Sequence, residues 1–236
     1  FIAEDGYKIL SVDYSQVELR LAAEMANIEN LKKAFQDGKD IHTLTAARVM
    51  DVDDDKVTPE QRRQAKAVNF GIIYGISAYG LSQQIGVSQK EASEFIKKYL
   101  SRFPELQDFM EEKKQEARDN GFVETLFGRK VIISGINEKN HGRRSAAERQ
   151  AINAPLQGTA ADIMKKAMVR MQPALNKAGL GARMVLQIHD ELIFEVPGEE
   201  VDETKKLVSE VMENTVDLDV PLIAEGQVAK SWADAH

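Results

Sequence analysis

The chain has 236 residues, of which 43% are hydrophobic and 29% charged, and its formal net charge at pH 7 is −7. This length and composition are those of an ordinary globular protein with one large domain or two smaller ones. The absence of cysteine excludes disulfides and Cys-ligated metal sites. No apolar run approaches the ~20 residues of a membrane span, so we expect no membrane partner.

The first residues do not resemble a signal peptide, and the chain runs from Phe1 almost directly into a strand, which we interpret as the start of a fragment, with a processed start as the alternative. Residues 7–12 predict a short buried strand that ends at Asp13. Ser15 and Glu18 have the S-x-x-E spacing of a capping box, which predicts a helix start directly after this strand. Asp13 is therefore expected at a corner where ligands collect in α/β units.

The long middle of the chain predicts mainly helices. The stretch 75–86 is punctuated by glycine and serine and predicts no regular element. The elements expected here are two helices within 28–50, further helices over 88–101 and 104–120, and a small hairpin within 121–134.

One predicted helix carries an unusual row of side chains. The T-P-E-Q sequence at 58–61 predicts its start by a capping box and a first-turn proline. Arg62, Lys66, Phe70 and Tyr74 then follow at steps of four, so they lie along one face over roughly 18 Å. Two cations and two rings over that length suit the phosphates, sugar and base of a nucleoside triphosphate. The alternative is an amphipathic helix with a solvated basic edge.

The last third of the chain returns to strands. A long helix from Ser145 is expected to kink or break at Pro155 and Gly158. Residues 181–197 alternate as two strands of a hairpin with His189-Asp190 at the turn, which lacks the favoured Asn-Gly chemistry. A helix over 199–214 and a strand over 222–228 complete the chain. Strands at both ends around a helical middle predict a mixed α+β fold with a helical insertion.

Acidic residues mark two of the predicted strand ends. If the strand before Asp13 and the hairpin that carries Asp190 and Glu191 are neighbours, Asp13 and Asp190 converge at one edge of the sheet. Carboxylates without a histidine cluster suit hard cations such as Mg²⁺. Two such ions ~3.5–4 Å apart assist phosphoryl transfer. The alternative is that both acids are solvated turn residues.

Together these stretches resemble motifs of family A DNA polymerases, the bacterial DNA polymerase I type. The sequence DYSQVELR at 13–20 resembles motif A, the helix over 62–75 resembles motif B, and QIHDE at 187–191 resembles motif C. Residues 148–162 are similar to a further stretch typical of the family, and the motifs occur in the family's order. The fold implied is an antiparallel-sheet palm, formed by both ends of the chain, with helical fingers inserted in it.

The resemblance implies a role for each matching residue. Asp13 and Asp190 match the metal-binding carboxylates for two Mg²⁺ ions, which Mn²⁺ can replace, and Tyr14 matches a backbone-carbonyl ligand. Glu191 matches the accessory acid of motif C, and Lys66 matches the residue that protonates the departing pyrophosphate.

The implied nucleotide-binding residues come mainly from motifs A and B. Glu18 matches the residue that crowds the sugar 2′ position, a role that can hold together or compete with capping. His42 matches a phosphate-contacting histidine, with a surface position at a helix start as the alternative. The full set that would bind the dNTP is Arg62, Lys66, Phe70, Tyr74, His42, Glu18 and Gln16.

Primer–template DNA is the other implied partner. Arg149, Asn153, Gln157 and His189 match residues that contact it near the active site. The net charge argues mildly against nucleic acid, but the cations between Arg129 and Arg149 form a local basic band.

The implied palm comprises residues 1–27 and 150–236, and the implied fingers comprise 28–149. The family's thumb and exonuclease domains have no counterpart in these residues, so the missing N-terminal portion of the parent chain is an expected partner and no nuclease activity is assigned. The family also implies a bacterial cytoplasmic location at the nucleoid.

Three other functions stay open. The chain could be a non-autonomous fragment that binds nucleotide and DNA but needs the missing thumb. A single-subunit RNA polymerase shares the motif layout, although Glu18 and Phe70 favour deoxynucleotides. A metal-dependent phosphohydrolase could use the His189-Asp190 pair, but such sites need several histidines and the chain has four in all.

Overall fold

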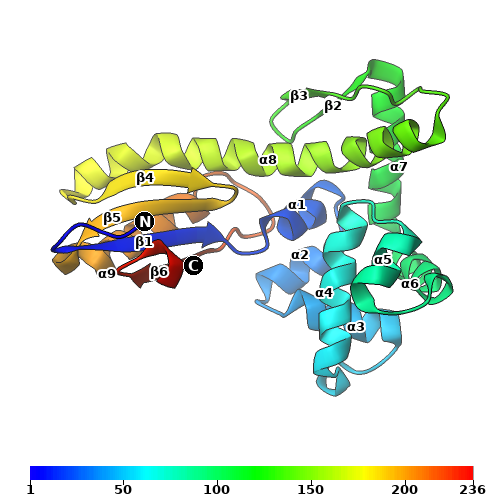
Figure 1. Cartoon of the computed structure of the whole chain (residues 1–236), viewed down its shortest axis with the longest axis horizontal. Helices are drawn as coiled ribbons and strands as arrows, with labels where there is room; N and C mark the ends of the chain where they lie inside the picture. The colour runs from blue at the N-terminus through cyan, green and yellow to red at the C-terminus, as the bar shows by residue number, and fades with distance from the viewer. Residues whose placement is uncertain (236) are drawn as a thin grey trace. The chain divides into compact units, whose positions relative to one another are not determined.

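The computed structural model describes residues 1–235, which form two compact units. Residues 1–17 together with those from 160 onward make the first, which we call the sheet unit, and residues 18–159 make the second, the helical unit. The predicted mixed α+β fold with strands from both chain ends is confirmed (Figure 1). The assignment of residue ranges to palm and fingers stays a prediction.

The sheet unit is built on four antiparallel strands in the order β4-β5-β1-β6, which are labelled in Figure 1. The N-terminal strand β1 lies between two strands from the C-terminal part, so neither end of the chain can complete this sheet alone. The strands are β1 (Tyr7–Tyr14), β4 (Arg183–Ile188), β5 (Glu191–Pro197) and β6 (Ala224–Ala229).

Alternation along β1 separates a packing face from a chemical face. Leu10, Val12 and Tyr14 share one face and are buried. The Tyr14 hydroxyl donates to the Met212 carbonyl oxygen at 2.8 Å, which joins β1 to helix α9 (Val201–Glu213). Ile9, Ser11 and Asp13 occupy the opposite face of the strand. The acidic residue is therefore on the face that α9 does not cover.

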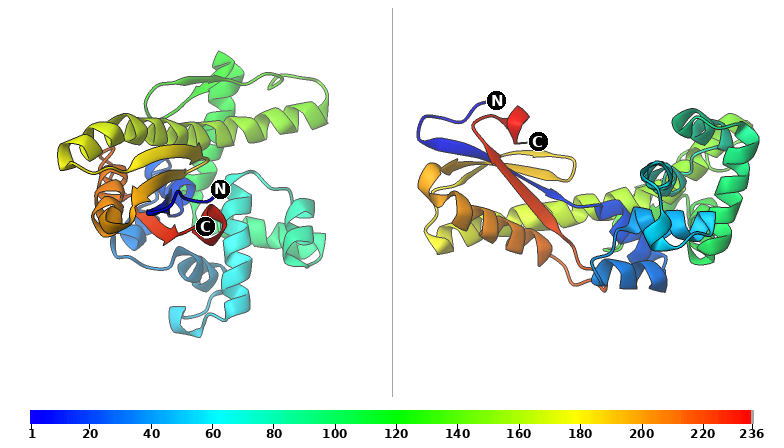
Figure 2. Two further views of the ribbon diagram at one scale, coloured as in Figure 1. Left: turned by 60° about the vertical axis from the view of Figure 1, so that its left-hand side comes forward. Right: turned by 90° about the horizontal axis from the view of Figure 1, so that it is seen from below.

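The helical unit is a set of short helices with one small hairpin (Figure 2). Helix α4 contacts α3 and α5, and α6 contacts α5 and α7. Its elements are α1 (Val17–Met25, starting at the unit boundary), α2 (Glu29–Gln36), α3 (Ile41–Met50), α4 (Pro59–Ile73), α5 (Ala78–Ile85), α6 (Gln89–Arg102), α7 (Pro104–Asn120), β2 (Phe122–Glu124), β3 (Lys130–Ile132) and the part of α8 (His141–Ala178) up to residue 159. Short 3-10 turns lie at Asp54–Lys56, Gly198–Glu200 and Trp232–Asp234.

Helix α5 was not predicted, because glycine and serine in the sequence suggested an irregular stretch. The same residue types instead define its ends. Ser77 accepts a hydrogen bond from the Gly80 N–H at 3.1 Å as the N-cap, and Gly86 ends the helix with φ 72°. Leu81 and Ile85 are buried. Packing of this apolar side outweighs the poor propensity of an interior glycine.

The prediction that Pro155 and Gly158 interrupt the long helix was wrong in the sense of a break, because α8 runs continuously from His141 to Ala178. An interior proline costs about 3 kcal/mol. Ile152 and Leu156 are buried on either side of it, and burying each such side chain contributes about 1.5–3 kcal/mol. Packing thus compensates for the lost hydrogen bond.

Gly158 has a packing role of its own. A Cβ there would lie 2.6 Å from Thr125 Cγ2, so glycine permits the β2–β3 loop to approach the helix. Thr159 joins the same elements, since its hydroxyl donates to the Pro155 carbonyl at 2.6 Å and accepts the Leu126 N–H at 3.0 Å. Pro155 and Gly158, which the sequence suggested as helix breakers, therefore lie where the β2–β3 loop packs on α8.

Within residues 1–235, none of the helices combines the length and hydropathy that crossing a bilayer requires.

Candidate active site

In the sheet unit, the strand that ends near Asp13 and the hairpin that carries Asp190 are neighbours, as the predicted acidic edge requires. Strands β1 and β5 are antiparallel neighbours, and their register places Asp13 opposite Glu191, directly after Asp190 in the turn. The Tyr14 N–H also donates to the Asp190 carbonyl oxygen at 3.1 Å. Strand pairing therefore brings Asp13, Asp190 and Glu191 to one end of the sheet, although 177 residues separate the two aspartates in sequence.

The ionised carboxylates at this edge of the sheet repel one another. Partial burial, then the negative charge of Asp190, raise the pKa of Asp13 above its ordinary value. Glu225, opposite Asp13 on β6, and Glu191 raise this pKa further. Repulsion among carboxylates is what a bound divalent cation relieves.

The donor set fits a hard cation that keeps part of its hydration shell. Among residues 1–235, no three acidic or histidine side chains form a complete coordination cluster. Mg²⁺ is typically held by one or two carboxylates, with water and substrate phosphates supplying its other ligands. Asp13 and Asp190 supply two carboxylates at one edge, so the residues present fit that mode of binding.

The turn that carries Asp190 has the expected unfavourable chemistry. His189 adopts φ 50°, in the left-handed region that favours glycine. Gln187 Nε2 donates to the His189 carbonyl oxygen at 2.8 Å across the turn. The side chain of His189 is exposed. A strained two-residue turn thus holds Asp190 close to the end of β1.

Helix α4 of the helical unit has the predicted start and side-chain row. Thr58 and Gln61 form both hydrogen bonds of the capping box. Arg62 and Lys66 are exposed and Phe70 is half-buried, as expected for one face of the helix. Tyr74 is the C-cap residue, before Gly75 with φ 67°.

Arg62 is held in place by a residue that the sequence did not single out. Its Nε donates to Asp40 Oδ2 at 2.5 Å. The other oxygen of Asp40 caps α3 by accepting the N–H groups of His42 and Thr43. Although burial raises the pKa of Asp40, the hydrogen bond from Arg62 and the two backbone bonds bring it below its ordinary value. One carboxylate therefore orients a cation and starts a helix.

His42 is buried at the start of α3, so the alternative of a surface histidine was wrong. Asn69 Nδ2 lies 3.0 Å from its Nδ1, and the ring centroids of His42 and Phe70 are 5.9 Å apart. Burial, followed by the positive charges of Arg62 and Lys66, lowers the pKa of His42, with Asp40 opposing. The imidazole is therefore neutral at pH 7. Asn69 was also missed from the sequence.

Glu18 contacts Tyr74 from the start of helix α1. The helix begins at Val17, and Gln16 immediately before it has φ 54°. The Tyr74 hydroxyl donates a hydrogen bond to Glu18 Oε2. The carboxylate thus joins the start of α1 to the end of α4, and the capping box of Ser15 and Glu18 stays a prediction.

A cavity of about 510 Å³ lies at this end of α4. Phe70, Tyr74 and the turn after α4 line it, together with Arg149 from α8. A Cβ on Gly75 would lie 3.0 Å from Arg149 Cγ, so glycine leaves room for the arginine stem. The two rings of the predicted nucleotide row thus border one open space.

Comparison with known proteins gives a consistent result. Residues 1–234 match the family described as DNA polymerase family A. The chain belongs to this family.

The curated relatives of this family A polymerase chain include DNA polymerase I of Pseudomonas aeruginosa, 49% identical over all of this chain and 26% of that protein. The thermostable DNA polymerase I of Thermus filiformis is also 49% identical, over all of this chain and 28% of its own length. A solved POL domain of Pol1 from M. smegmatis, in complex with DNA primer-template and dNTP, is 42% identical with a TM-score of 0.93. That match covers all of this chain and 42% of the other. The chain spans about a quarter of the length of these curated relatives.

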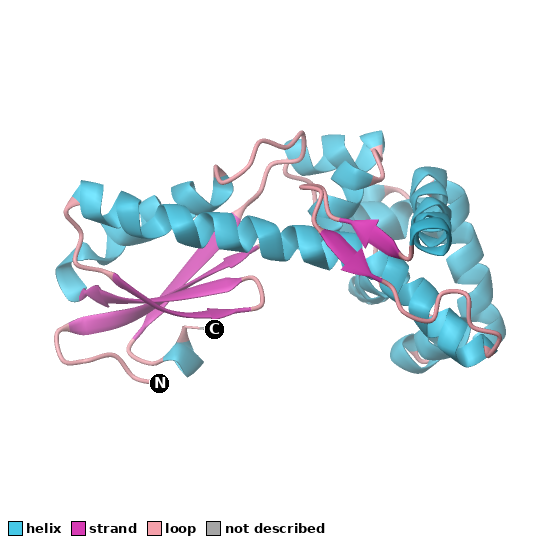
Figure 3. Ribbon diagram, turned by 90° about the horizontal axis from the view of Figure 1, so that it is seen from above, coloured by secondary structure: helices cyan, strands magenta, loops and turns pink. Residues whose placement is uncertain are grey.

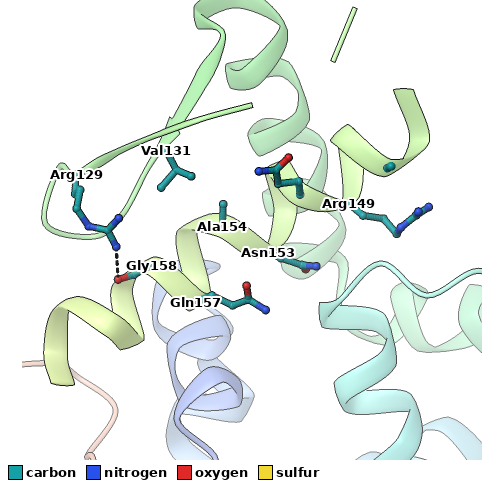
Figure 4. A pocket seen from close by; sticks show the side chains of 9 residues that line it. Arg129, Val131, Arg149, Asn153, Ala154, Gln157 and Gly158 are labelled. Carbon is teal, nitrogen blue, oxygen red and sulfur yellow. Dashed lines mark hydrogen bonds between the residues drawn. The ribbon is translucent and has the colours of Figure 1, made fainter. Parts of the chain in front are cut away.

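Three of the residues predicted to contact DNA line a second cavity of the chain, of about 550 Å³ (Figure 4). Arg149, Asn153 and Gln157 follow one another at four-residue steps on α8, so they share one face. Arg129 from the β2–β3 loop also lines it and donates to the Gly158 carbonyl at 2.9 Å. Asn153 Nδ2 in addition donates to the Tyr74 carbonyl at 3.4 Å. His189, the fourth predicted residue, belongs to the sheet unit.

Sequence reasoning missed five residues that touch or influence the predicted site: Asp40, Asn69 and Glu225, together with Ser11 and Trp232, which both donate hydrogen bonds to Glu191. No motif or spacing in the sequence marks them, because each is brought to its place by strand register or helix packing.

Proposed function

We propose that the chain carries out template-directed DNA synthesis, in which a nucleotide passes from a dNTP to a primer 3′-hydroxyl and pyrophosphate leaves. The observation that carries this proposal is the acidic edge, where strand register places Asp13 opposite Glu191 and so near Asp190, and where partial burial and the charge of Asp190 raise the pKa of Asp13. Family membership and the solved relative with primer-template and dNTP support it.

Two Mg²⁺ ions, or Mn²⁺ in their place, would be held by Asp13, Asp190 and the Tyr14 carbonyl and would supply Lewis acidity for the transfer. The primer 3′-hydroxyl loses its proton to solvent, and its oxygen forms the new bond to the α-phosphorus as the bond to the pyrophosphate oxygen breaks. Arg62 and Lys66 neutralise the triphosphate, and the Lys66 ammonium gives a proton to the departing pyrophosphate. Glu191 adds a fixed negative charge at the carboxylate edge.

The remaining roles are those that the family resemblance implies, and five of these residues line the two cavities. Phe70 would lie beside the sugar and Tyr74 beside the templating base, with Glu18 and Gln16 near the sugar edge and His42 donating to a phosphate. Arg149, Asn153 and Gln157 would contact the primer–template, and His189 would lie near the primer terminus. The sheet unit would serve as the palm and the helical unit as the fingers. Because its substrate would be DNA, the protein would act at the bacterial nucleoid.

Primer extension tests the proposal directly. The chain is mixed with a primed template, dNTPs and Mg²⁺, and Asp13→Asn serves as the matched control. Extension by the wild type alone is the expected result, and equal extension by the Asn variant would overturn the metal assignment. Parallel reactions with Mn²⁺ and with rNTPs define the ion and separate a DNA polymerase from a single-subunit RNA polymerase.

A second candidate function follows from the length of the chain, which is about a quarter of that of the curated relatives. We propose that added polypeptide corresponding to the remaining domains strengthens the grip on DNA. If the chain binds dNTP but extends primers only when joined to that polypeptide, it is a non-autonomous fragment. Hydrolysis of phosphate esters without DNA would instead favour a phosphohydrolase.

A further inference from the structure

Glu191 is the least exposed carboxylate of the acidic edge, at 4%. Its Oε1 accepts two hydrogen bonds, one from the Ser11 hydroxyl and one from the Trp232 indole Nε1 at 3.0 Å. An indole N–H can only donate and an ionised carboxylate can only accept, so the direction of the second bond is fixed. Hydrogen bonds to a buried charge are strong and directional.

The two donors approach from different parts of the sheet unit. Ser11 is on β1 two residues before Asp13, and therefore on the same face as that aspartate. Trp232 begins the short turn Trp232–Asp234 that follows β6. The C-terminal segment thus reaches the face of the sheet that carries the carboxylates.

This segment is anchored to the first residues of the chain (Figure 3). The Trp232 N–H donates to the Phe1 carbonyl at 3.0 Å, Ile2 forms a β-bridge with Ser231, and the Phe1 and Trp232 ring centroids lie 6.0 Å apart. The Trp232 side chain also packs against an apolar cluster that contains Ile9 and Ile193. The indole is held by backbone bonds and by packing, so its N–H has a defined direction.

We propose that Trp232 is a positioning residue for the carboxylate edge and acts through Glu191. With Oε1 bound to Trp232 and Ser11, Glu191 keeps one rotamer opposite Asp13 and leaves the divalent cation to Asp13 and Asp190. Without the indole N–H, the Glu191 carboxylate turns more freely and competes with Asp13 and Asp190 for the cation. The proposal rests on the proposed function, because it assumes that the edge binds divalent cations.

Cation binding tests it without turnover. Trp232 is the only tryptophan of the chain, so its fluorescence should change as Mg²⁺ fills the wild-type edge, but not in Asp13→Asn. Mn²⁺ affinity, measured by calorimetry on the whole chain, should fall about three- to tenfold in Trp232→Phe, which keeps a ring and removes the donor. Ser11→Ala should change it in the same direction.

The matched control is Tyr7→Phe. Tyr7 packs against the same apolar cluster, and this change also removes one polar atom from an aromatic side chain. It should leave Mn²⁺ affinity and the thermal unfolding midpoint unchanged. In the Glu191→Ala background, Trp232→Phe should have no further effect on Mn²⁺ affinity, because the residue through which Trp232 acts is gone.

Primer extension supplies the second readout. Trp232→Phe should lower kcat several-fold while KM for dNTP stays constant, since the triphosphate ligands are untouched. Wild-type affinity and kcat in Trp232→Phe, or an equal loss with and without Glu191, would overturn the positioning role. A wild-type chain that binds no Mn²⁺ at the edge would instead contradict the proposed function itself.

Discussion

The two units hold their charged residues in different ways. In the sheet unit, strand register and a backbone hydrogen bond align Asp13, Asp190 and Glu191, of which Glu191 is buried. In the helical unit, Arg62 and Lys66 stand exposed on α4, and the ion pair that restrains Arg62 is itself largely exposed.

The difference is physically reasonable. Like-charged carboxylates repel, so they remain close only where the backbone forces them together. Arg62 and Lys66 are exposed and therefore stay hydrated until an anion binds, and exposed ion pairs restrain such side chains only weakly. The backbone holds the carboxylates in a defined arrangement, whereas the cations of α4 have only weak restraints.

The largest effect is expected from a carboxylate. Asp190→Ala should lower nucleotide incorporation by about 10³-fold or more, because the lost metal ligand is worth several kcal/mol of transition-state stabilisation. Single-turnover extension measures the loss, and circular dichroism with a thermal melt checks that the fold persists. Retained turnover in a folded variant would contradict the metal assignment.

Lys66→Ala should lower incorporation by about 10²-fold, because an exposed cation contributes only when the triphosphate is bound. Its effect should fall on dNTP use, with DNA affinity nearly unchanged. Arg63→Ala is the matched control, since Arg63 is exposed on the same helix but pairs with Glu60. If Lys66→Ala weakened DNA binding as much as dNTP use, its phosphate role would fail.

Removing Glu18 should act on sugar selection. Glu18→Ala opens space beside Tyr74 and should raise ribonucleotide incorporation by about tenfold, the ratio that 1.4 kcal/mol represents. Tyr74→Phe, which keeps the ring but loses the hydrogen bond to Glu18, should raise it less. Competition between labelled dNTP and rNTP measures both, and unchanged discrimination would leave Glu18 with a purely structural contact.

Asp40 tests the weaker restraint of the helical unit. Asp40→Ala should lower the free energy of unfolding by about 1 kcal/mol through the lost N-cap of α3. Because the pKa of Asp40 is lowered in the folded state, its charge stabilises the protein above its ordinary value of 3.8, and this contribution is lost as the pH falls through the folded pKa. Urea unfolding of wild type and Asp40→Ala at pH 7 measures the loss of the cap. The same measurement on Asp40→Asn at pH 7 and pH 3 isolates the contribution of the charge, and a difference from wild type that does not depend on pH would contradict that contribution.

The smallest effect concerns the stability of the preorganised edge. Without divalent cations, Asp13→Asn should stabilise the chain at pH 7, by less than about 1 kcal/mol given the exposure of the site. The folded pKa of Asp13 is raised, so the wild-type penalty develops as the pH rises above 3.8 and disappears below it. Unfolding in chelator at pH 7 and pH 3 compares the two chains. A destabilised Asn variant at pH 7 would show that repulsion does not dominate.

Elements with strong local signals were predicted correctly. The capping box at Thr58 and Gln61, the proline start of α7 and the alternation of β4 each specify their own structure within a few residues. Local signals failed at Pro155 and in α5, where burial of Leu156 and Leu81 decides against propensity. Propensity differences are small beside the free energy of burying a large side chain.

The sequence by itself determined the family motifs, the helical row from Arg62 to Tyr74 and the positions of the carboxylates at strand ends. Only the tertiary structure placed Asp13 beside Asp190, joined Tyr74 to Glu18, and brought Trp232 to Glu191. Periodicity and capping act over a few residues, so the chain records them locally. Pairing between β1 and β5 joins segments 177 residues apart and depends on the free energy of the whole folded sheet, which no short stretch of sequence contains.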